Sequence, residues 1–236
     1  MTIDNVVGTI EVWLGFMTAD LFSSTQNEGC AEYFSEYTCL FRGGLLSRMD
    51  DIISELENLL LSEPFRRVVT PAGNLMSVSM SSCGAWGWTS DHAGYRYVSI
   101  SPATGMPWPD MPVTFYQLAV YFAGQAGYHD FKPDSCLINC YRPGSIMGLH
   151  QDKDEADLSA PVVSFSLGPG AEFMWGGTER SMPWHTIHLY HGDVLVWGGK
   201  DRLRFHGVRR VLPEWNPWTG DCRINLTFRK TEQSNL

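Results

Sequence analysis

The tripeptide His150-Gln151-Asp152 places a histidine and an aspartate two residues apart. On a β-strand, residues i and i+2 project from the same face, so this imidazole and this carboxylate would point the same way. With a histidine from a distant strand they would form a set of two histidines and one carboxylate, which binds iron(II) and leaves coordination positions open for oxygen. A pattern as short as H-x-D also occurs in surface turns, so the tripeptide alone leaves both interpretations open.

The segment Arg223–Arg229 alternates polar and apolar residues, with an arginine at each end of its polar face. If the apolar face packs against helices, both arginines point into the interior, where they need anionic partners. A dicarboxylate co-substrate would supply two carboxylates, which suit the planar guanidinium group. An edge strand whose arginines face water fits the pattern equally well.

Other residues could serve the same site. Asn139 and Tyr141 form another i, i+2 pair, which could hydrogen-bond the co-substrate or lie on a surface strand. Among the histidines that compete for the third ligand position, His206 lies in an alternating stretch followed by a glycine. The remaining ones are interpreted as structural or as lying in loops, namely His185, His188 and His191, and His92 and His129.

The elements that must position these residues can also be predicted. Residues 45–60 carry leucine, isoleucine and methionine at helical spacing, which predicts an amphipathic helix. A second helix is expected from Val113 to about Gln125, with Pro112 in its first turn. The stretch 70–108 is rich in Gly, Ser, Pro and aromatic residues, which indicates short strands and loops where binding residues tend to lie.

After residue 135 the chain consists of short runs bounded by Gly, Pro or Asp. They predict an all-β C-terminal half, a sandwich or jelly roll with helices packed outside. The expected strands are Cys136–Tyr141, Pro161–Leu167, Ala171–Trp175, Thr186–Leu189, Asp193–Trp197 and Arg223–Arg229.

Length and composition indicate one globular domain. The chain has 236 residues, of which 44% are hydrophobic and 18% charged. No apolar run approaches the ~20 residues of a membrane-spanning helix, and no basic cluster marks a secretory signal. The six cysteines form no C-x-x-C pair, so free thiols in a reducing, cytoplasmic compartment are expected, and no membrane partner.

The net charge of −9 argues at first against a nucleic-acid partner. The excess lies in residues 1–63, which hold 11 acidic residues against Arg42 and Arg48, whereas the remainder holds 15 acidic and 15 basic residues. The segment Lys200–Arg210 is locally basic. It could contact a short piece of nucleic acid or be an ordinary solvated loop.

The motifs taken in order resemble the AlkB family of Fe(II)/2-oxoglutarate-dependent nucleic-acid dealkylases. They are NCYRPGSIMGLHQDKDE, VVSFSLG, GDVLVWGG, RFHGV and DCRINLTFR, and VVTPAGNLMSVSMSSCGAWGWTSDHAGYRY is similar to the substrate-binding lid of that family. The resemblance runs from about Leu45 to Arg229. It implies an α+β, mainly β fold: a double-stranded β-helix (jelly roll) with N-terminal helices and a nucleotide-binding lid at about 70–108. The catalytic domain would span 41–236, after a variable acidic segment 1–40 that matches only at MTADLF.

The resemblance also implies roles for individual residues. The iron ligands would be His150, Asp152 and His206. The 2-oxoglutarate contacts would be Arg223 with Tyr141 and Asn225 at the distal carboxylate, and Arg229 and Asn139 at the end that chelates the metal. The substrate contacts would be Trp88, Tyr95, Asp154 and Arg180, with Met80 and Met76 lining the pocket.

The implied reaction consumes 2-oxoglutarate and O2 and hydroxylates an N-alkyl carbon of a base such as 1-methyladenine or 3-methylcytosine. The hydroxylated product releases an aldehyde and leaves the repaired base. The expected partner of the monomer is DNA, single-stranded or with a flipped base, and RNA is a further candidate. Two alternatives remain: an oxygenase of the same chemistry acting on a protein or a small metabolite, and a β-barrel binding module without catalysis.

Overall fold

The computed structural model describes residues 31–232. Most of the acidic segment, including the MTADLF phrase, lies outside the described residues. The part that is described, residues 31–40, contributes to the first two strands of the main sheet. The boundary expected at residue 40 therefore falls within a strand.

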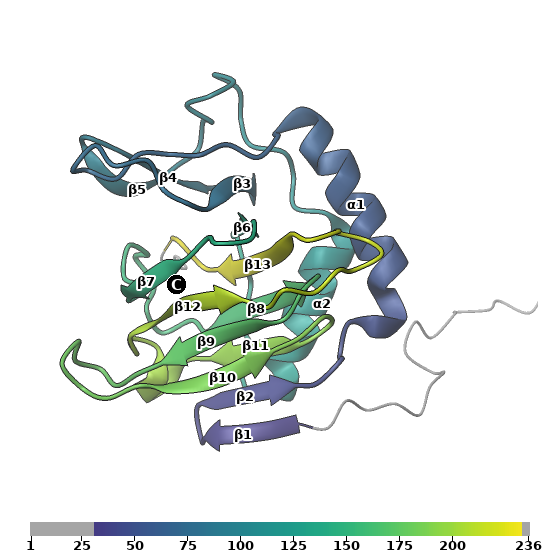
Figure 1. The fold of residues 1–236 in the computed structure, drawn as a ribbon, viewed down its shortest axis with the longest axis vertical. Coiled ribbons are helices and arrows are strands. Elements are labelled where there is room, and N and C mark those ends of the chain that lie inside the picture. Colours follow the sequence, from purple (N-terminus) through teal and green to yellow (C-terminus); the bar gives the residue numbers. More distant parts are fainter. Residues whose placement is uncertain (1–30, 233–236) are drawn as a thin grey trace, which may run out of the picture.

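A seven-stranded sheet forms the centre of the fold (Figure 1). Its strand order is β1-β2-β11-β8-β13-β6-β3, and all neighbouring strands are antiparallel. The strands are β1 (Ala31–Ser35), β2 (Thr38–Phe41), β3 (Ser79–Gly84), β6 (Ser135–Tyr141), β8 (Val162–Leu167), β11 (Val194–Trp197) and β13 (Arg223–Arg229).

A four-stranded antiparallel sheet in the order β10-β9-β12-β7 packs against it. Its strands are β7 (Met147–His150), β9 (Ala171–Trp175), β10 (His185–Leu189) and β12 (His206–Val211). Apolar residues of both sheets share one core cluster, among them Leu195 of the large sheet and Phe173 of the small one. Two face-to-face antiparallel sheets confirm the expected jelly roll.

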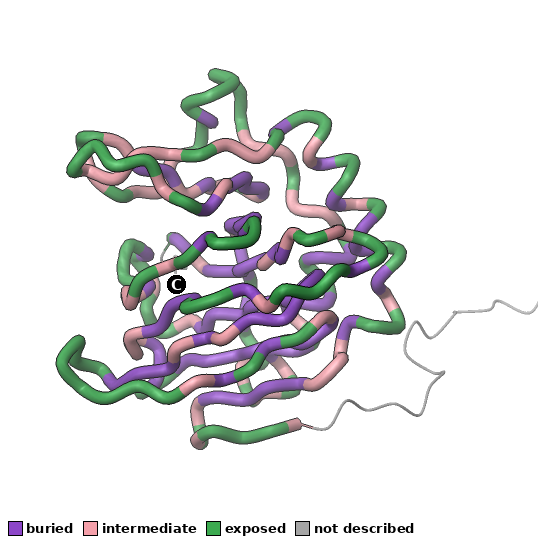
Figure 2. The backbone as a smooth tube through the Cα atoms, in the orientation of Figure 1, coloured by how far each residue is buried: buried purple, intermediate pink, exposed green. Residues whose placement is uncertain are grey.

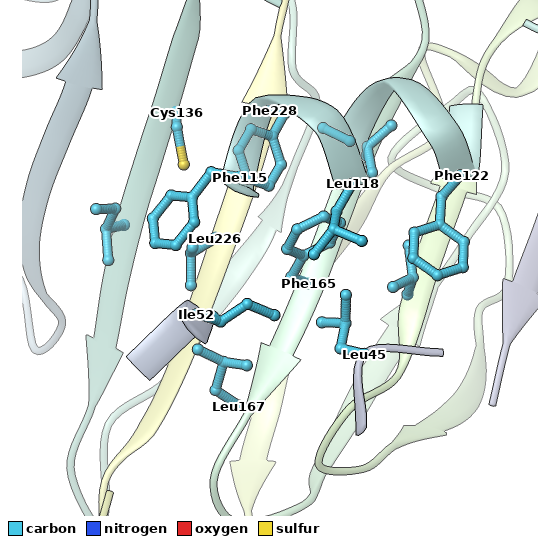
Figure 3. Packing of buried hydrophobic residues seen from close by; sticks show 14 of the residues in the cluster. Leu45, Ile52, Phe115, Leu118, Phe122, Cys136, Phe165, Leu167, Leu226 and Phe228 are labelled. Atoms are coloured by element: carbon cyan, nitrogen blue, oxygen red, sulfur yellow. The ribbon is translucent and has the colours of Figure 1, made fainter. Parts of the chain in front are cut away.

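Two helices cover the opposite face of the large sheet (Figure 1). They are α1 (Met49–Ser62), which follows the short 3₁₀ turn η1 (Leu46–Arg48), and α2 (Val113–Gln125). Figure 3 shows Phe115, Leu118 and Phe122 of α2 packed on Phe165 and Phe228 of the sheet. The predicted helix 113–125 is confirmed, whereas the first one begins at Met49 because the chain turns at Gly43 and Gly44 and leaves Leu46 exposed.

A separate two-stranded hairpin, β4 (Gly87–Asp91) and β5 (Gly94–Val98), projects beside the open end of the two sheets (Figure 1). Most of its backbone is exposed or half-buried, whereas the strands of the large sheet are mostly buried (Figure 2). The hairpin lies within the stretch 70–108 that was predicted to hold short strands and loops. In this article it is called the lid.

The six strands predicted after residue 135 are all present, with ends that differ by at most one residue. Strands β7 and β12 were not among them, because β7 has four residues and each lies next to a turn rich in Gly, Pro or polar residues. The remaining short 3₁₀ turn is η2 (Gly199–Asp201). Among the described residues, no helix is long and apolar enough to span a membrane.

Candidate metal centre and substrate cavity

The small sheet brings together the three residues expected to bind iron. His150 ends β7, Asp152 follows two residues later, and His206 opens β12 directly opposite His150 in the β7–β12 ladder. One potential ligand atom from each residue lies within 4.8 Å of the other two, and this is the one such His/Cys/Asp/Glu group found among residues 31–232. Strands β7 and β12, with the residues that directly follow β7, therefore form a two-histidine, one-carboxylate set. Asp152 lies beyond the end of β7, so the expectation that it shares a strand face with His150 was wrong.

Backbone carbonyls orient both imidazoles. The Nδ1 atom of His150 lies 2.9 Å from the carbonyl oxygen of Gly148, and Nδ1 of His206 lies 2.9 Å from that of Arg204. A carbonyl only accepts, so each Nδ1 carries the proton and each Nε2 keeps its lone pair for a metal. Both Nε2 atoms face Asp152, at 3.8 Å from its carboxylate oxygens.

The electrostatics favour the ligand forms of these groups. Burial alone would raise the pKa of the Asp152 carboxyl, but Arg229 and the two histidines hold it well below its usual range. Arg229 donates to Oδ2 of Asp152 from Nε at 3.0 Å and from Nη2 at 2.8 Å. Burial, assisted by His150, lowers the pKa of the His206 imidazole to about 4. At neutral pH the carboxylate is therefore charged and His206 is uncharged.

Strands β6 and β13 place the expected 2-oxoglutarate contacts side by side. Arg223 pairs with Tyr141 and Asn225 with Asn139 in the β13–β6 ladder, and all of them line one cavity together with Arg229. Burial raises the pKa of the Tyr141 hydroxyl to about 12, so it remains a hydrogen-bond donor. The expectation that the arginines of this strand point inward is confirmed.

Buried polar atoms without partners test whether this cradle suits a dicarboxylate. Arg223 is 1% exposed, and its Nε atom has no hydrogen-bond partner. Its other nitrogens meet only neutral oxygens, Oγ of Ser166 at 2.9 Å and the carbonyl of Pro169 at 3.5 Å. Nη1 of Arg229 is also a buried donor without a partner. A buried guanidinium without a carboxylate requires an anion, so the cradle fits 2-oxoglutarate.

Asn225 lies in the cradle but is already bonded. Its Nδ2 atom donates to Oγ of Ser164 and to the carbonyl of Phe165, both at 2.8 Å, and its Oδ1 accepts from Thr227 at 2.8 Å. Because both amide hydrogens are used, Asn225 is arranged to brace β8 against β13.

The metal group and the cradle open into a cavity of about 550 Å³ that reaches the lid. The rings of Trp88 and Tyr95 stack with centroids 5.5 Å apart and an interplanar angle of 17°. Nε1 of Trp88 donates to Oδ2 of Asp154 at 3.2 Å. Met76, Met80 and Arg180 line the same cavity, and the Arg180 guanidinium lies 5.2 Å from the centroid of the Phe205 ring. All the expected substrate contacts thus meet in one place.

Three further residues line this cavity that were not predicted from the sequence: Tyr97, Glu155 and Phe205. The Tyr97 hydroxyl donates to Oε1 of Glu155 at 2.7 Å, so the lid is tied to the loop that follows the metal ligands. The spacing of Tyr95 and Tyr97 on one strand, and the run of acidic residues after Asp152, could have indicated them.

The basic segment Lys200–Arg210 does not form a continuous basic surface. Arg202 is 2% exposed, Arg204 is paired with Asp201, and the exposed Arg209 and Arg210 are both paired with Glu172. Neither expected reading, a nucleic-acid contact or a solvated loop, describes the buried Arg202.

The described cysteines are free, as expected; they are Cys39, Cys83, Cys136, Cys140 and Cys222, while Cys30 lies outside the described residues.

Comparison with known proteins identifies the family. Residues 39–229 match the model of the 2OG-Fe(II) oxygenase superfamily. The chain is 46% identical over 211 residues to the alpha-ketoglutarate-dependent dioxygenase AlkB of Escherichia coli, which covers 89% of this chain and 97% of that protein. It is 36% identical over 149 residues to the DNA N(6)-methyladenine demethylase ALKBH1D of Arabidopsis thaliana, covering 51% and 33% of the two chains.

A solved structure agrees with this result. The structure of OsALKBH1 matches with a TM-score of 0.75 and 30% identity, over 85% of this chain and 100% of that one. Together with a metal group of two histidines and one aspartate beside an arginine cradle, these similarities show that the chain belongs to the AlkB family of 2-oxoglutarate- and Fe(II)-dependent dioxygenases.

Proposed function

We propose that the protein removes alkyl groups from N-alkylated nucleobases, of the 1-methyladenine and 3-methylcytosine type, in DNA, with RNA as a second candidate polymer. The observation that carries this proposal is the cavity. The stacked pair of Trp88 and Tyr95 and the carboxylate of Asp154 line the same space as the three metal-binding side chains. A planar base is the ligand that such a surface suits.

His150, Asp152 and His206 would hold the iron, and Arg223, Tyr141, Arg229 and Asn139 would hold 2-oxoglutarate. Iron with 2-oxoglutarate and O2 supplies the oxidation of the alkyl carbon when bound, and the protein supplies binding, orientation and shielding from water. The Arg223 guanidinium, which hydrogen-bonds only to neutral oxygens, would take the distal carboxylate. Burial lowers the pKa of Arg223 to about 10, which still leaves it charged at neutral pH.

The lid would receive a base that has left its stack, because an alkyl carbon cannot reach the metal from within a duplex. Trp88 offers a ring face for stacking, worth about 1–3 kcal/mol per base. Methylation of adenine N1 or cytosine N3 adds positive charge to the ring, which the carboxylate of Asp154 would favour. Nε1 of Trp88 donates a hydrogen bond to this carboxylate. The side chain that would stack on the base therefore also orients the carboxylate that would favour its positive charge.

An oxygenase acting on a protein or a small metabolite would need the same metal and arginine residues but not the aromatic pair of the lid. The two functions can be separated by measuring succinate release from 2-oxoglutarate with alkylated oligonucleotides, unmodified oligonucleotides, peptides and small acids. Stimulation by the alkylated oligonucleotide alone is expected. Stimulation by a peptide or small acid, with none by any oligonucleotide, would overturn the proposal and favour the second function.

We also propose that the protein acts as a monomer in the cytoplasm. Its free cysteines support a reducing compartment, because Cys83 and Cys136 face each other across the β3–β6 ladder and remain unlinked.

A further inference from the structure

Two short segments beside the metal group, residues 151–152 and 202–203, are joined by two hydrogen bonds from a side chain to a main-chain carbonyl. Nη1 of Arg202 donates to the carbonyl oxygen of Asp152 at 2.6 Å, and Nε2 of Gln151 donates to the carbonyl oxygen of Leu203 at 2.6 Å. Each segment thus gives one side-chain donor and one main-chain acceptor to the other. We call these four residues the reciprocal clamp.

The clamp joins the two parts of the chain that carry the metal-binding residues. Asp152 itself belongs to the first segment, and the second segment ends three residues before His206. Asp152 lies beyond the last residue of β7, outside the hydrogen-bonded ladder of β7 and β12. Its main-chain position therefore depends on contacts such as the clamp.

Arg202 is built into the interior rather than placed at the surface. Its side chain is 2% exposed, and every nitrogen has a partner: besides Asp152, Nε donates to the carbonyl of Ala160 at 2.9 Å and Nη2 to Oε2 of Glu155 at 3.2 Å. All three partners lie in the loop between β7 and β8. One guanidinium thus fixes the beginning, middle and end of the loop that holds Asp152.

The charges around Arg202 are balanced. The carboxylate of Glu155 lies 3.2 Å from Arg202 and 3.2 Å from Nε of Arg229, which in turn binds Asp152. Two buried guanidinium groups and two buried carboxylates therefore form a neutral network. Removing one member leaves an unpaired charge in the interior.

We propose that Arg202 and Gln151 are positioning residues that set the placement of Asp152 relative to His206, and so set the affinity of the site for its metal. The proposal rests on the ligand set His150, Asp152 and His206 of the proposed function. Arginine is required because a lysine ammonium keeps the charge but cannot reach three separated acceptors in one plane. Groups that orient metal ligands in this way typically change metal affinity 10–100-fold when they are removed.

The proposal can be tested by titrating Mn(II) into metal-free protein without nucleic acid, and following free Mn(II) by electron paramagnetic resonance. Arg202→Lys is expected to weaken Mn(II) binding by about 10–100-fold. Gln151→Met keeps the length of a half-buried side chain but removes both amide donors, so it should fold and weaken binding by about tenfold, the lower end of that range. Arg42→Lys is the matched control, because Arg42 also binds a carbonyl and carboxylates but lies away from the metal group.

The control should bind Mn(II) with an affinity within about twofold of the native protein, even if its melting temperature falls. If folded Gln151→Met and Arg202→Lys both bind Mn(II) with native affinity, the proposed role of the clamp is overturned. It is also overturned if the control Arg42→Lys loses as much Mn(II) affinity as these two variants. If Arg202→Lys does not fold, native affinity in Gln151→Met alone is enough to overturn it. A native protein that binds no Mn(II) would instead refute the ligand set. Tight binding without dealkylation would refute only the proposed function.

Discussion

At the residue scale, the site depends on side chains whose charge is defined by burial and by their neighbours. Arg223, Arg229 and His206 are nearly inaccessible to water, yet each is aligned toward the shared cavity. The alternation of Arg223–Arg229 predicted that both arginines share one face of the strand. It did not decide between an inward face and an edge strand facing water, and the burial of both arginines settles this in favour of the inward face. Burial of Arg202 could not be predicted, because a run of basic residues normally indicates a surface and its three acceptors include backbone carbonyls that no pattern marks.

Replacing Arg223 with methionine should raise the KM for 2-oxoglutarate about 10- to 150-fold, because a hydrogen bond to a charged group contributes about 1.5–3 kcal/mol. This KM is obtained from steady-state rates of succinate release at varied concentrations of 2-oxoglutarate. The KM for the oligonucleotide should change little, since Arg223 lies in the β13–β6 ladder and the lid contacts come from β4 and β5. An unchanged KM for 2-oxoglutarate would show that another residue binds the distal carboxylate.

Replacing Asp154 with asparagine removes the charge and keeps an oxygen that can accept from Nε1 of Trp88. Turnover of the cationic 1-methyladenine should fall more than turnover of a neutral alkyl adduct, because only the cationic base gains from a nearby carboxylate. Competition between the two substrates in one reaction gives the ratio of their kcat/KM values directly. If kcat/KM falls equally for both adducts, Asp154 does not recognise the charge of the base.

The low pKa of His206 predicts a pH-dependent stability of the metal-free protein. Its folded-state pKa is about 4 against 6.5 for the unperturbed group. Between these values the unfolded chain binds the additional proton, so stability falls as pH falls through this window, by on the order of 3 kcal/mol in total. Melting temperatures from about pH 7 to about pH 4.5 should fall more steeply for the native protein than for His206→Gln. If the melting temperatures of the two proteins fall in parallel with pH, His206 is not the group responsible for the pH dependence.

At the element scale, the lid and the two sheets position different parts of the site. The sheets fix the metal group and the arginine cradle, whereas the two-stranded lid carries the aromatic rings. The sequence indicated short strands and loops in this region, and the family resemblance indicated their purpose. Neither could show that Tyr97 is hydrogen-bonded to Glu155, because that contact joins residues 58 positions apart in the chain. Strands β1 and β2 were also missed, since β1 is an exposed edge strand without a clear alternation.

Replacing Trp88 with alanine should raise the KM for a methylated oligonucleotide by about 5- to 150-fold, the equivalent of about 1–3 kcal/mol of stacking. The KM for 2-oxoglutarate should remain near the native value. Trp215→Ala is the control, because Trp215 is 73% exposed and does not line the cavity. Equal effects of the two substitutions on the oligonucleotide KM would argue against a stacking role for the lid.

At the scale of the whole molecule, the helices and the site lie on opposite faces of the same strands. Phe228 packs edge-to-face against Phe115 of α2 with ring centroids 6.3 Å apart, while its neighbour Arg229 faces the metal group. The jelly roll with helices outside was predictable from strand length and alternation. The pairing of β7 with β12, which joins His150 to His206, was not, because no local pattern specifies which distant strands meet.

Phe115→Ala should therefore lower the free energy of unfolding by about 3–5 kcal/mol, as expected for a phenylalanine removed from a packed core. Urea denaturation followed by circular dichroism measures it, with Tyr116→Ala on the exposed side of the same helix as the control. The KM for 2-oxoglutarate of the folded fraction should stay within about twofold of the native value. A large rise in this KM would mean that α2 contributes to the site as well as to the core.

The proposed function requires that the cavity accept an alkylated base beside the metal site of His150, Asp152 and His206. The most direct measurement incubates the protein with iron(II), ascorbate, 2-oxoglutarate and a single-stranded oligonucleotide carrying 1-methyladenine, and follows the mass of the oligonucleotide. Loss of the methyl mass is expected with the native protein and none with His150→Ala. An unchanged oligonucleotide mass, in native protein that binds iron and 2-oxoglutarate, would contradict the proposed function.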